Sequence, residues 1–361
     1  MPEAGVKTFS VIACPDAGQT AVPVLARTAQ ALQAADATVV SQRIFGSGGD
    51  GLESPPLWSP GSGPAWPVTR LCGNGRAPAT RPSSQISAIS GGEVRPLRLD
   101  GHILGSLFED DYAEYCVLGD LRPKDVAASH SLQARSVFEG IEEAIRLAGM
   151  DLSHIVRTWF FLDTILDWYS DFNSVRTGFF SERGMFERFL PASTGVGTSN
   201  AGGAALVADV LAMKPKDGRL NIREVRSPLQ CPATQYRSSF SRAVEIRSAG
   251  YRRLYISGTA SICPDGETAH RGDMARQVAL AMRVAEGILN RCEMDWSNVV
   301  RGSAYFKNLD DKPVFDNYLQ ERELPGLPII TAAADICRDD LLFEIEIDAA
   351  TGSSATVVLR P

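Results

Sequence analysis

Apolar and polar side chains alternate along residues 337–348, a stretch near the end of the chain. A period of two predicts a β-strand whose apolar residues share one face. The other face carries Glu344, Glu346 and Asp348. Carboxyl groups two residues apart on a strand point the same way. They suit acid–base chemistry if their face lines a pocket, and they are ordinary solvated carboxylates if it faces water. The pattern leaves both interpretations open.

The first hundred residues predict short strands, one helix and long loops. Residues 46–65 and 76–92 are rich in Gly, Pro and Ser, which predicts loops. Residues 46–51 match G-x-G-x-x-G after a strand, but prolines follow instead of the helix that a dinucleotide site requires, so we reject that site. The predicted elements are strands at 7–14, 37–45, 66–72 and 93–99, and a helix at 22–35.

Beyond residue 100 the same order of elements occurs twice: two strands, a helix, a strand, a helix and two strands. This order predicts an α+β fold in which helices cover one face of a mixed sheet. The first copy has strands at 101–108, 112–119, 155–162, 191–197 and 204–213, and helices at 127–148 and 166–183. The second copy has strands at 240–247, 253–262, 299–306, 328–336 and 341–348, and helices at 272–290 and 311–321.

The repeat also holds for single residues, which recur after 144 positions. The long helix of each copy carries apolar residues at i, i+3, i+4 and i+7, so each helix packs one face on a sheet. We infer a duplication, with a truncated unit at 1–96 and complete units at 97–220 and 221–361. The matching residues are Gln133 and Gln277, Met150-Asp151 and Met294-Asp295, Ser153 and Ser297, and Val156-Arg157 and Val300-Arg301.

Composition narrows the possible partners. The chain has 361 residues, of which 44% are hydrophobic and 22% charged, as in globular proteins with more than one core. A net charge of −7 argues against nucleic acid or an anionic membrane surface as a partner, and we find no apolar run long enough to span a membrane. Four scattered histidines predict no transition-metal site. Seven scattered cysteines predict free thiols in a reducing cytoplasm, and the N-terminus predicts no secretion signal.

Several motifs lie between about residues 150 and 350. They are Arg157-Thr158-Trp159, Pro191-Ala192-x-Thr194-Gly195-x-Gly197, Tyr236 with Phe240-x-Arg242, Ile256-Ser257-x-Thr259-Ala260, His270-x-Gly272-Asp273, and Asp335-Ile336-x-Arg338-x-Asp340-Leu341-Leu342-x-Glu344-Ile345-Glu346. These motifs resemble the Rid (YjgF) family, and they resemble the chorismatases more closely. Rid proteins are small α+β subunits that form trimers with active clefts between subunits, whereas chorismatases are single chains of Rid-like units that cleave chorismate. The resemblance implies a single-chain pseudo-trimer, monomeric, that acts on a small dicarboxylate without a metal or cofactor.

The resemblance implies an enzyme that cleaves the enolpyruvyl ether of chorismate to pyruvate and a hydroxybenzoate. Glu344 matches the acid of the family, which would be kept neutral by burial and would protonate the enol methylene carbon. Glu346 is expected to be structural. The other expected site residues are Arg157 and Arg242 for the substrate carboxylates, Tyr236 for a hydroxyl or carboxylate, and Gly258, Thr259 and Cys337 for the pocket.

Each of these residues also has an ordinary structural interpretation. An arginine on a sheet face can form an ion pair, and Tyr236 can be a packed aromatic. Gly258 can mark a β-bulge, and Cys337 can be a small buried hydrophobe.

Gly258 and Cys337 are the positions that indicate which product the resemblance implies. In the chorismatase branch that forms 3-hydroxybenzoate the matching positions are Gly and Cys, whereas the branch that forms a dihydroxycyclohexadiene acid has Ala at both. The resemblance therefore implies 3-hydroxybenzoate.

Two other functions stay open. A Rid-type enamine or imine deaminase holds its substrate carboxylate with the Arg of a P-A-R run, but Ser193 stands at that position here. A non-catalytic small-molecule binder would use the same cleft. Because Ala208 is placed where Glu344 falls in the second copy, we expect one competent site.

Overall fold

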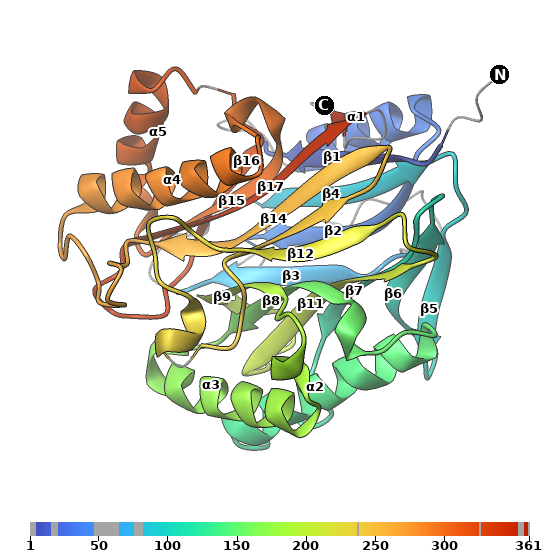
Figure 1. Cartoon of the computed structure of the whole chain (residues 1–361), viewed down its shortest axis with the longest axis horizontal. Helices are drawn as coiled ribbons and strands as arrows, with labels where there is room; N and C mark the ends of the chain where they lie inside the picture. Colours follow the sequence, from blue (N-terminus) through green and yellow to red (C-terminus); the bar gives the residue numbers. More distant parts are fainter. Residues whose placement is uncertain are drawn as a thin grey trace.

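The computed structural model describes residues 5–15, 21–46, 65–75, 82–236, 238–324, 326–352 and 357–359. Its strands form three six-stranded mixed sheets, with the helices on the outside (Figure 1). Helices α2 (His130–Leu147) and α3 (Ile165–Glu182) lie along one side, and α4 (Met274–Arg291) and α5 (Lys312–Glu321) along another. This arrangement confirms the predicted α+β fold of a single-chain pseudo-trimer.

The first sheet, sheet A, has the strand order β10-β3-β2-β4-β1-β18 and packs against α1 (Ala21–Ala34). Its two outer strands come from distant parts of the chain. β18 (Val357–Leu359) pairs parallel with β1, and β10 (Ser199–Asn200) pairs antiparallel with β3. The N-terminal segment therefore completes its sheet with strands from elsewhere. The other strands are β1 (Lys7–Ala13), β2 (Thr38–Phe45), β3 (Val68–Gly73) and β4 (Ser83–Ser90).

The prediction of a loop at 76–92 is wrong for residues 83–90, which form strand β4. It lies between β1 and β2, in the interior of sheet A. Its serines and glutamine gave no alternating pattern, yet Ser84 and Gln85 are buried. The Nε2 group of Gln85 donates a hydrogen bond to the carbonyl oxygen of Gly302 at 2.8 Å, which satisfies that polar group inside the protein. Residues 47–64 and 76–81, with most of the glycine-rich motif at 46–51, lie outside the described residues.

Sheets B and C share one plan, which supports the inferred duplication. Their strand orders are β5-β6-β7-β11-β8-β9 and β12-β13-β14-β17-β15-β16. In both sheets the last pair is parallel and the other pairs are antiparallel. Sheet B consists of β5 (Arg95–Leu99), β6 (His102–Glu109), β7 (Ala113–Leu121), β8 (Ile155–Leu162), β9 (Ala192–Gly197) and β11 (Leu206–Pro215). Sheet C consists of β12 (Asn221–Val225), β13 (Ala243–Arg247), β14 (Tyr251–Ala260), β15 (Val299–Phe306), β16 (Ile329–Ala333) and β17 (Phe343–Gly352).

The apolar stripes predicted for the two long helices are the faces that pack on the sheets. Val137 and Ile141 of α2, and their repeat-mates Ala281 and Ala285 of α4, are all buried. The aspartates of the repeated Met-Asp pairs have the same structural role in both copies. Asp151 and Asp295 each accept a hydrogen bond from a backbone N–H two residues later, at 2.8 Å, and so cap matching 3-10 turns. The division into units at 1–96, 97–220 and 221–361 stays our interpretation of these repeats.

The strand register corrects one sequence assignment. Glu344 lies opposite Tyr305, and Tyr305 is the repeat-mate of Phe161. Phe161 lies opposite Val207, so Val207 and not Ala208 occupies the position of Glu344 in the first copy. A shift of one residue moves a side chain to the other face of a strand, which is why the approximate alignment failed here.

Candidate active site

Strand β17 begins at Phe343, so the predicted strand at 337–348 is shorter than the alternating pattern indicated. Its apolar face packs beneath α4 in the core of sheet C. Its polar face is also buried: Glu344 is 5% exposed and Glu346 is 3% exposed. The solvated interpretation of the acidic face is therefore wrong.

Glu344 opens into a cleft of about 790 Å³ between sheets B and C. Helix α3 and strand β9 line the cleft from one side, and β14 and β17 from the other. Glu344 is the one acidic residue among the described lining residues. The others include Tyr169, Arg176, Ser193, Gly195, Phe240, Arg242, Gly258, Ala260, Cys337 and Arg338.

The carboxyl group of Glu344 is held neutral. Burial, together with the negative charge of Glu346, raises the pKa of Glu344 from its ordinary value of 4.5 to about 8. The positive charges of Arg157 and Arg242 oppose this rise but do not cancel it. At neutral pH the residue therefore carries a proton that it can donate.

Glu346 is the charged member of the pair. It accepts hydrogen bonds from Arg157 Nη2 at 2.7 Å and from Trp159 Nε1 at 2.8 Å. Burial alone would raise the pKa of Glu346, but Arg157 and Arg43 outweigh burial and hold the pKa below its ordinary value. Two carboxyl groups on one strand face thus have opposite protonation states, and the ionised one stabilises the neutral form of the other.

Gly258 makes room for the acid. A Cβ atom at this position would collide with Oε1 of Glu344 and would lie 2.9 Å from its Cδ atom. The backbone N–H of Gly258 donates a hydrogen bond to Thr194 Oγ1 at 3.0 Å, and that hydroxyl donates to Glu346 at 2.5 Å. The strand register also shifts between Ile256 and Thr259, so the predicted β-bulge is present as well. Thr194 was quoted in a motif but was not recognised as a site residue.

Two predicted substrate contacts lie elsewhere. Arg157 is fully buried behind Glu346 and is not among the residues that line the cleft, because its guanidinium is used in the ion pair. Thr259 is also buried and does not line the cleft, since its hydroxyl donates to the carbonyl oxygen of Ser257 at 2.8 Å. In this arrangement Arg157 positions a carboxylate of the protein rather than one of the substrate.

Three arginines do line the cleft. Arg242, as predicted, lines the cleft; it stands immediately before β13 and donates from Nε to the carbonyl oxygen of Cys231 at 3.0 Å. Arg176 of α3 was missed; its Nη2 donates to Asn173 Oδ1 at 2.6 Å, and its guanidinium lies 5.7 Å from the ring centre of Phe240. Arg338 was also missed, although it stands in the motif that contains Glu344. Three cations beside one neutral acid suit a dianionic ligand.

The remaining predicted residue with a described side chain is Cys337, which lines the cleft beside Glu344. Burial raises the pKa of the Cys337 thiol to about 12, so the thiol is neutral and is a poor nucleophile. Burial likewise raises the pKa of Tyr169, on the facing helix α3, to about 12. The side chain of Tyr236 lies outside the described part of the chain, and its role stays a prediction.

Within the described residues, no group of three or more His, Cys, Asp or Glu side chains is placed to hold a metal ion. In the same residues, no helix is both long enough and apolar enough to cross a membrane.

Comparison with known proteins agrees with this architecture. A family model described as Endoribonuclease L-PSP matches residues 232–351. A crystal structure of a chorismatase superposes with a TM-score of 0.68 over 96% of this chain and 99% of the other, at 18% sequence identity. That likeness concerns the fold.

Two curated relatives come from Streptomyces. A protein named 3-hydroxybenzoate synthase from Streptomyces hygroscopicus is 29% identical over 239 residues. A protein named chorismatase from Streptomyces rapamycinicus is 27% identical over 236 residues. The matched regions cover 58% of this chain and 66% and 68% of these relatives, so the chain matches slightly less than two thirds of the first.

Proposed function

Because residues 232–351 match the Endoribonuclease L-PSP family model and the chain has the fold of a chorismatase, we propose that it cleaves chorismate to pyruvate and a hydroxybenzoate. The observation that carries the proposal is Glu344, a buried carboxylic acid whose raised pKa keeps it protonated in a cleft lined by three arginines. The names of the two Streptomyces relatives support the same substrate.

The proposed reaction starts with proton transfer. Glu344 gives its proton to the methylene carbon of the enolpyruvyl group, which leaves a cation at the ether carbon. Ionised Glu346 lies next to Glu344 on the strand and favours its neutral form. Arg176, Arg242 and Arg338 line the cleft, and we propose that they bind the two substrate carboxylates.

The atoms balance without a co-reactant. Chorismate is isomeric with the sum of hydroxybenzoate and pyruvate, so no water is consumed overall and no oxidant is needed. The ring hydroxyl next to the ether bonds to the ring carbon that bears the ether oxygen, that ring C–O bond breaks, and pyruvate leaves. The epoxide formed in this step opens at its other C–O bond, which leaves the oxygen at position 3, and the ring loses a proton as it becomes aromatic. Glu344, now a carboxylate, can take up that proton and return to its starting state.

We further propose 3-hydroxybenzoate as the product. Whether water or the ring hydroxyl of the substrate captures the cation depends on the shape of the pocket next to the acid. Gly258 and Cys337 both line the cleft beside Glu344, where a change from Gly or Cys to Ala alters that shape directly.

The deaminase alternative has less support. The cleft is lined at the relevant position by Ser193, whose hydroxyl accepts a hydrogen bond from Thr158 at 2.9 Å and offers no cation to a substrate carboxylate.

The deciding experiment is incubation of the purified protein with chorismate, with pyruvate and aromatic acids separated by chromatography. We expect equal amounts of pyruvate and 3-hydroxybenzoate. No pyruvate above the uncatalysed background would overturn the proposal. Pyruvate with a different aromatic or diene acid would keep the cleavage and overturn the product assignment. Ammonia release from an imino acid, with chorismate untouched, would favour the deaminase.

A further inference from the structure

The hydroxyl group of Thr194 joins sheets B and C beside the two carboxyl groups of the site. Thr194 stands on β9 and is 1% exposed. Its Oγ1 atom accepts hydrogen bonds from Arg157 Nη2 at 2.7 Å and from the backbone N–H of Gly258 at 3.0 Å, and it donates to Oε2 of Glu346 at 2.5 Å. The hydroxyl thus makes as many hydrogen bonds as it can, and all of them are to the protein.

The donors around the two carboxyl groups are shared unequally. Among the described residues, none donates a hydrogen bond to Glu344, which lies two residues before Glu346 on the same strand face. Hydrogen bonds to a carboxylate lower its pKa, so this distribution keeps the protonation states of the two groups apart. Glu346 instead accepts bonds from five described side chains, those of Arg157, Trp159, Thr194, Ser303 and Tyr305.

The backbone N–H of Gly258 is the donor that the Thr194 hydroxyl keeps away from the acid. Gly258 lies against Glu344, because a Cβ atom there would collide with Oε1 of that carboxyl group. Its N–H donates to Thr194 instead. Without the hydroxyl this N–H loses its acceptor, and the unpaired donor is next to Glu344, whose ionised carboxylate would satisfy it.

The boundary between sheets A and B contains the same hydroxyl bridge, that is, a threonine hydroxyl that donates to a carboxylate and accepts a backbone N–H. Thr69 of β3 is 1% exposed; it donates to Oδ1 of Asp209 at 2.5 Å and accepts the backbone N–H of Asp120 at 2.9 Å. Arg43 pairs with Asp209 at 2.7 Å. The hydroxyl bridge is therefore a repeated feature of the architecture.

The second bridge lies beside no counterpart of the acid. Asp209 lies opposite Trp159 in the strand register. Glu346 lies opposite Ser303, the residue 144 positions after Trp159, so the two carboxylates occupy equivalent positions. The residue two positions before Asp209 is Val207, an apolar side chain in place of the acid. A change of Thr69 therefore removes a hydroxyl bridge without touching the proton donor.

We propose that Thr194 is a positioning residue, whose hydroxyl directs the neighbouring donors to Glu346 and leaves Glu344 without one. Its importance for turnover rests on the proposed function, in which Glu344 supplies the proton. In Thr194→Val the N–H of Gly258 should donate to Glu344 and stabilise its ionised form. The other donors to Glu346 are unchanged by this substitution, so Glu346 stays ionised.

The first measurement does not require chorismate. Glu344→Gln is made in wild type and in Thr194→Val, and the difference in unfolding free energy within each pair is measured in urea from pH 5 to pH 9. This difference stops changing once Glu344 is ionised in the folded state. The pH at which it becomes level should be about one unit lower in Thr194→Val, since each backbone N–H lowers the pKa of a carboxylate by roughly that much.

Thr69→Val is the matched control. It removes the hydroxyl bridge from the boundary of sheets A and B, so it should destabilise the protein, but the difference should become level at the wild-type pH. Thr194→Ser keeps the hydroxyl and should also match wild type. If Thr194→Val does not fold, Thr194→Ala removes the hydroxyl without adding a methyl group in its place.

The second measurement is kcat/KM for chorismate against pH, whose upper limit should move down in Thr194→Val by the same amount. An unchanged pH in the urea measurement of Thr194→Val overturns the role of Thr194, as does an equal shift in Thr69→Val or in Thr194→Ser. If wild type does not cleave chorismate, the proposed function fails, and the urea measurement still decides the role of Thr194.

Discussion

The substitution Glu344→Gln separates the acidity of this side chain from its shape. The amide fills the same space but has no proton to donate. General acid catalysis commonly contributes a factor of at least about 100, so the turnover of chorismate should fall by that factor or more. The fold should persist, since the described structure shows no hydrogen bond or ion pair that depends on the charge of Glu344.

The same variant makes a quantitative prediction about stability. The pKa of Glu344 is about 8 in the folded protein and near 4.5 when unfolded. Between these values the folded state holds a proton that the unfolded state has released. The stabilising contribution is therefore complete below pH 4.5 and is lost as the pH rises through 8.

The size of the effect follows from linkage. The free energy of unfolding falls by up to about 1.4 kcal/mol per pH unit in this window, or by about 2.5 kcal/mol from pH 5 to pH 7. The Gln variant lacks this pH-dependent contribution to the free energy of unfolding. Its stability should therefore rise relative to wild type by that amount over the same interval, while Glu346 stays ionised in both proteins and contributes equally.

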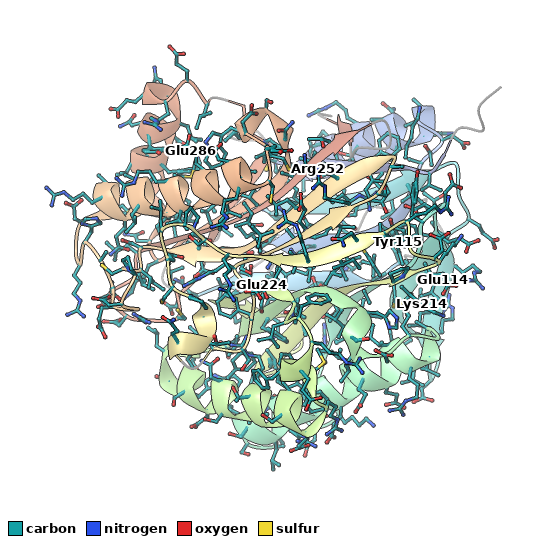
Figure 2. The ribbon with its side chains drawn as sticks, viewed as in Figure 1. Glu114, Tyr115, Lys214, Glu224, Arg252 and Glu286 are labelled. Atoms are coloured by element: carbon teal, nitrogen blue, oxygen red, sulfur yellow. The ribbon has the colours of Figure 1, made fainter. Side chains whose placement is uncertain are left out.

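Urea denaturation of both proteins at pH 5, 6 and 7 measures the difference. The Glu114→Gln variant, at a half-buried surface position, is the control and should follow the pH dependence of wild type (Figure 2). Parallel stability curves for wild type and Glu344→Gln would show that Glu344 is ionised in the folded state, contrary to our reasoning. Turnover of Glu344→Gln at the wild-type rate would show that the proton comes from another group.

Three further substitutions and the pH profile test the surroundings of the acid. In wild type, kcat/KM should be level below pH 8 and fall about tenfold per unit above it, as Glu344 loses its proton; a level profile to pH 10 contradicts this. Gly258→Ala should displace the carboxyl group and reduce hydroxybenzoate formation about tenfold or more, whereas Gly195→Ala, whose added Cβ has its nearest neighbour at 4.0 Å, should be tolerated; equal activities refute the steric argument. Glu346→Gln leaves the buried Arg157 without its carboxylate and should lower the free energy of unfolding by about 3–5 kcal/mol in a denaturation assay. The same change should lower the pKa of Glu344, so the pH above which activity falls should move to a lower value. Arg338→Gln should raise KM about 10- to 100-fold with little change in kcat, and an unchanged KM would remove it from the substrate site.

Much of the fold was predictable because the duplicated segments obey simple periodicities. The helix stripes recur after 144 residues, and the strands next to them are short apolar runs. Strand β4 could not be found this way, because Ser84 and Gln85 are polar and are buried only through contacts across sheets. Strands β10 and β18 were missed for a related reason: each is two or three residues long and depends on a partner that is distant in the chain.

The site was predictable in part. Residue pattern and family resemblance singled out Glu344, and the cleft contains it together with Arg242, Gly258 and Cys337. The sequence pattern could not show which arginines bind a ligand. It is the same for an arginine that faces a ligand and for one that pairs with a carboxylate of the protein. Arg157 was expected in the cleft and pairs with Glu346, whereas Arg176 stands on an aromatic helix that gave no hint of a cleft.

Arg43 links the N-terminal sheet to the two buried carboxyl groups of the site. It comes from β2 of sheet A, outside the residues 232–351 that the family model matches, and its guanidinium lies 4.6 Å from the ring centre of Trp159 and 3.9 Å from Glu346. Its charge helps to keep Glu346 ionised, and ionised Glu346 helps to keep Glu344 protonated. A part of the chain outside the family-model match thus affects how tightly Glu344 holds the proton that we propose it donates. Substitutions in that part of the chain should therefore shift the pH optimum of the reaction even when every residue that lines the cleft is unchanged.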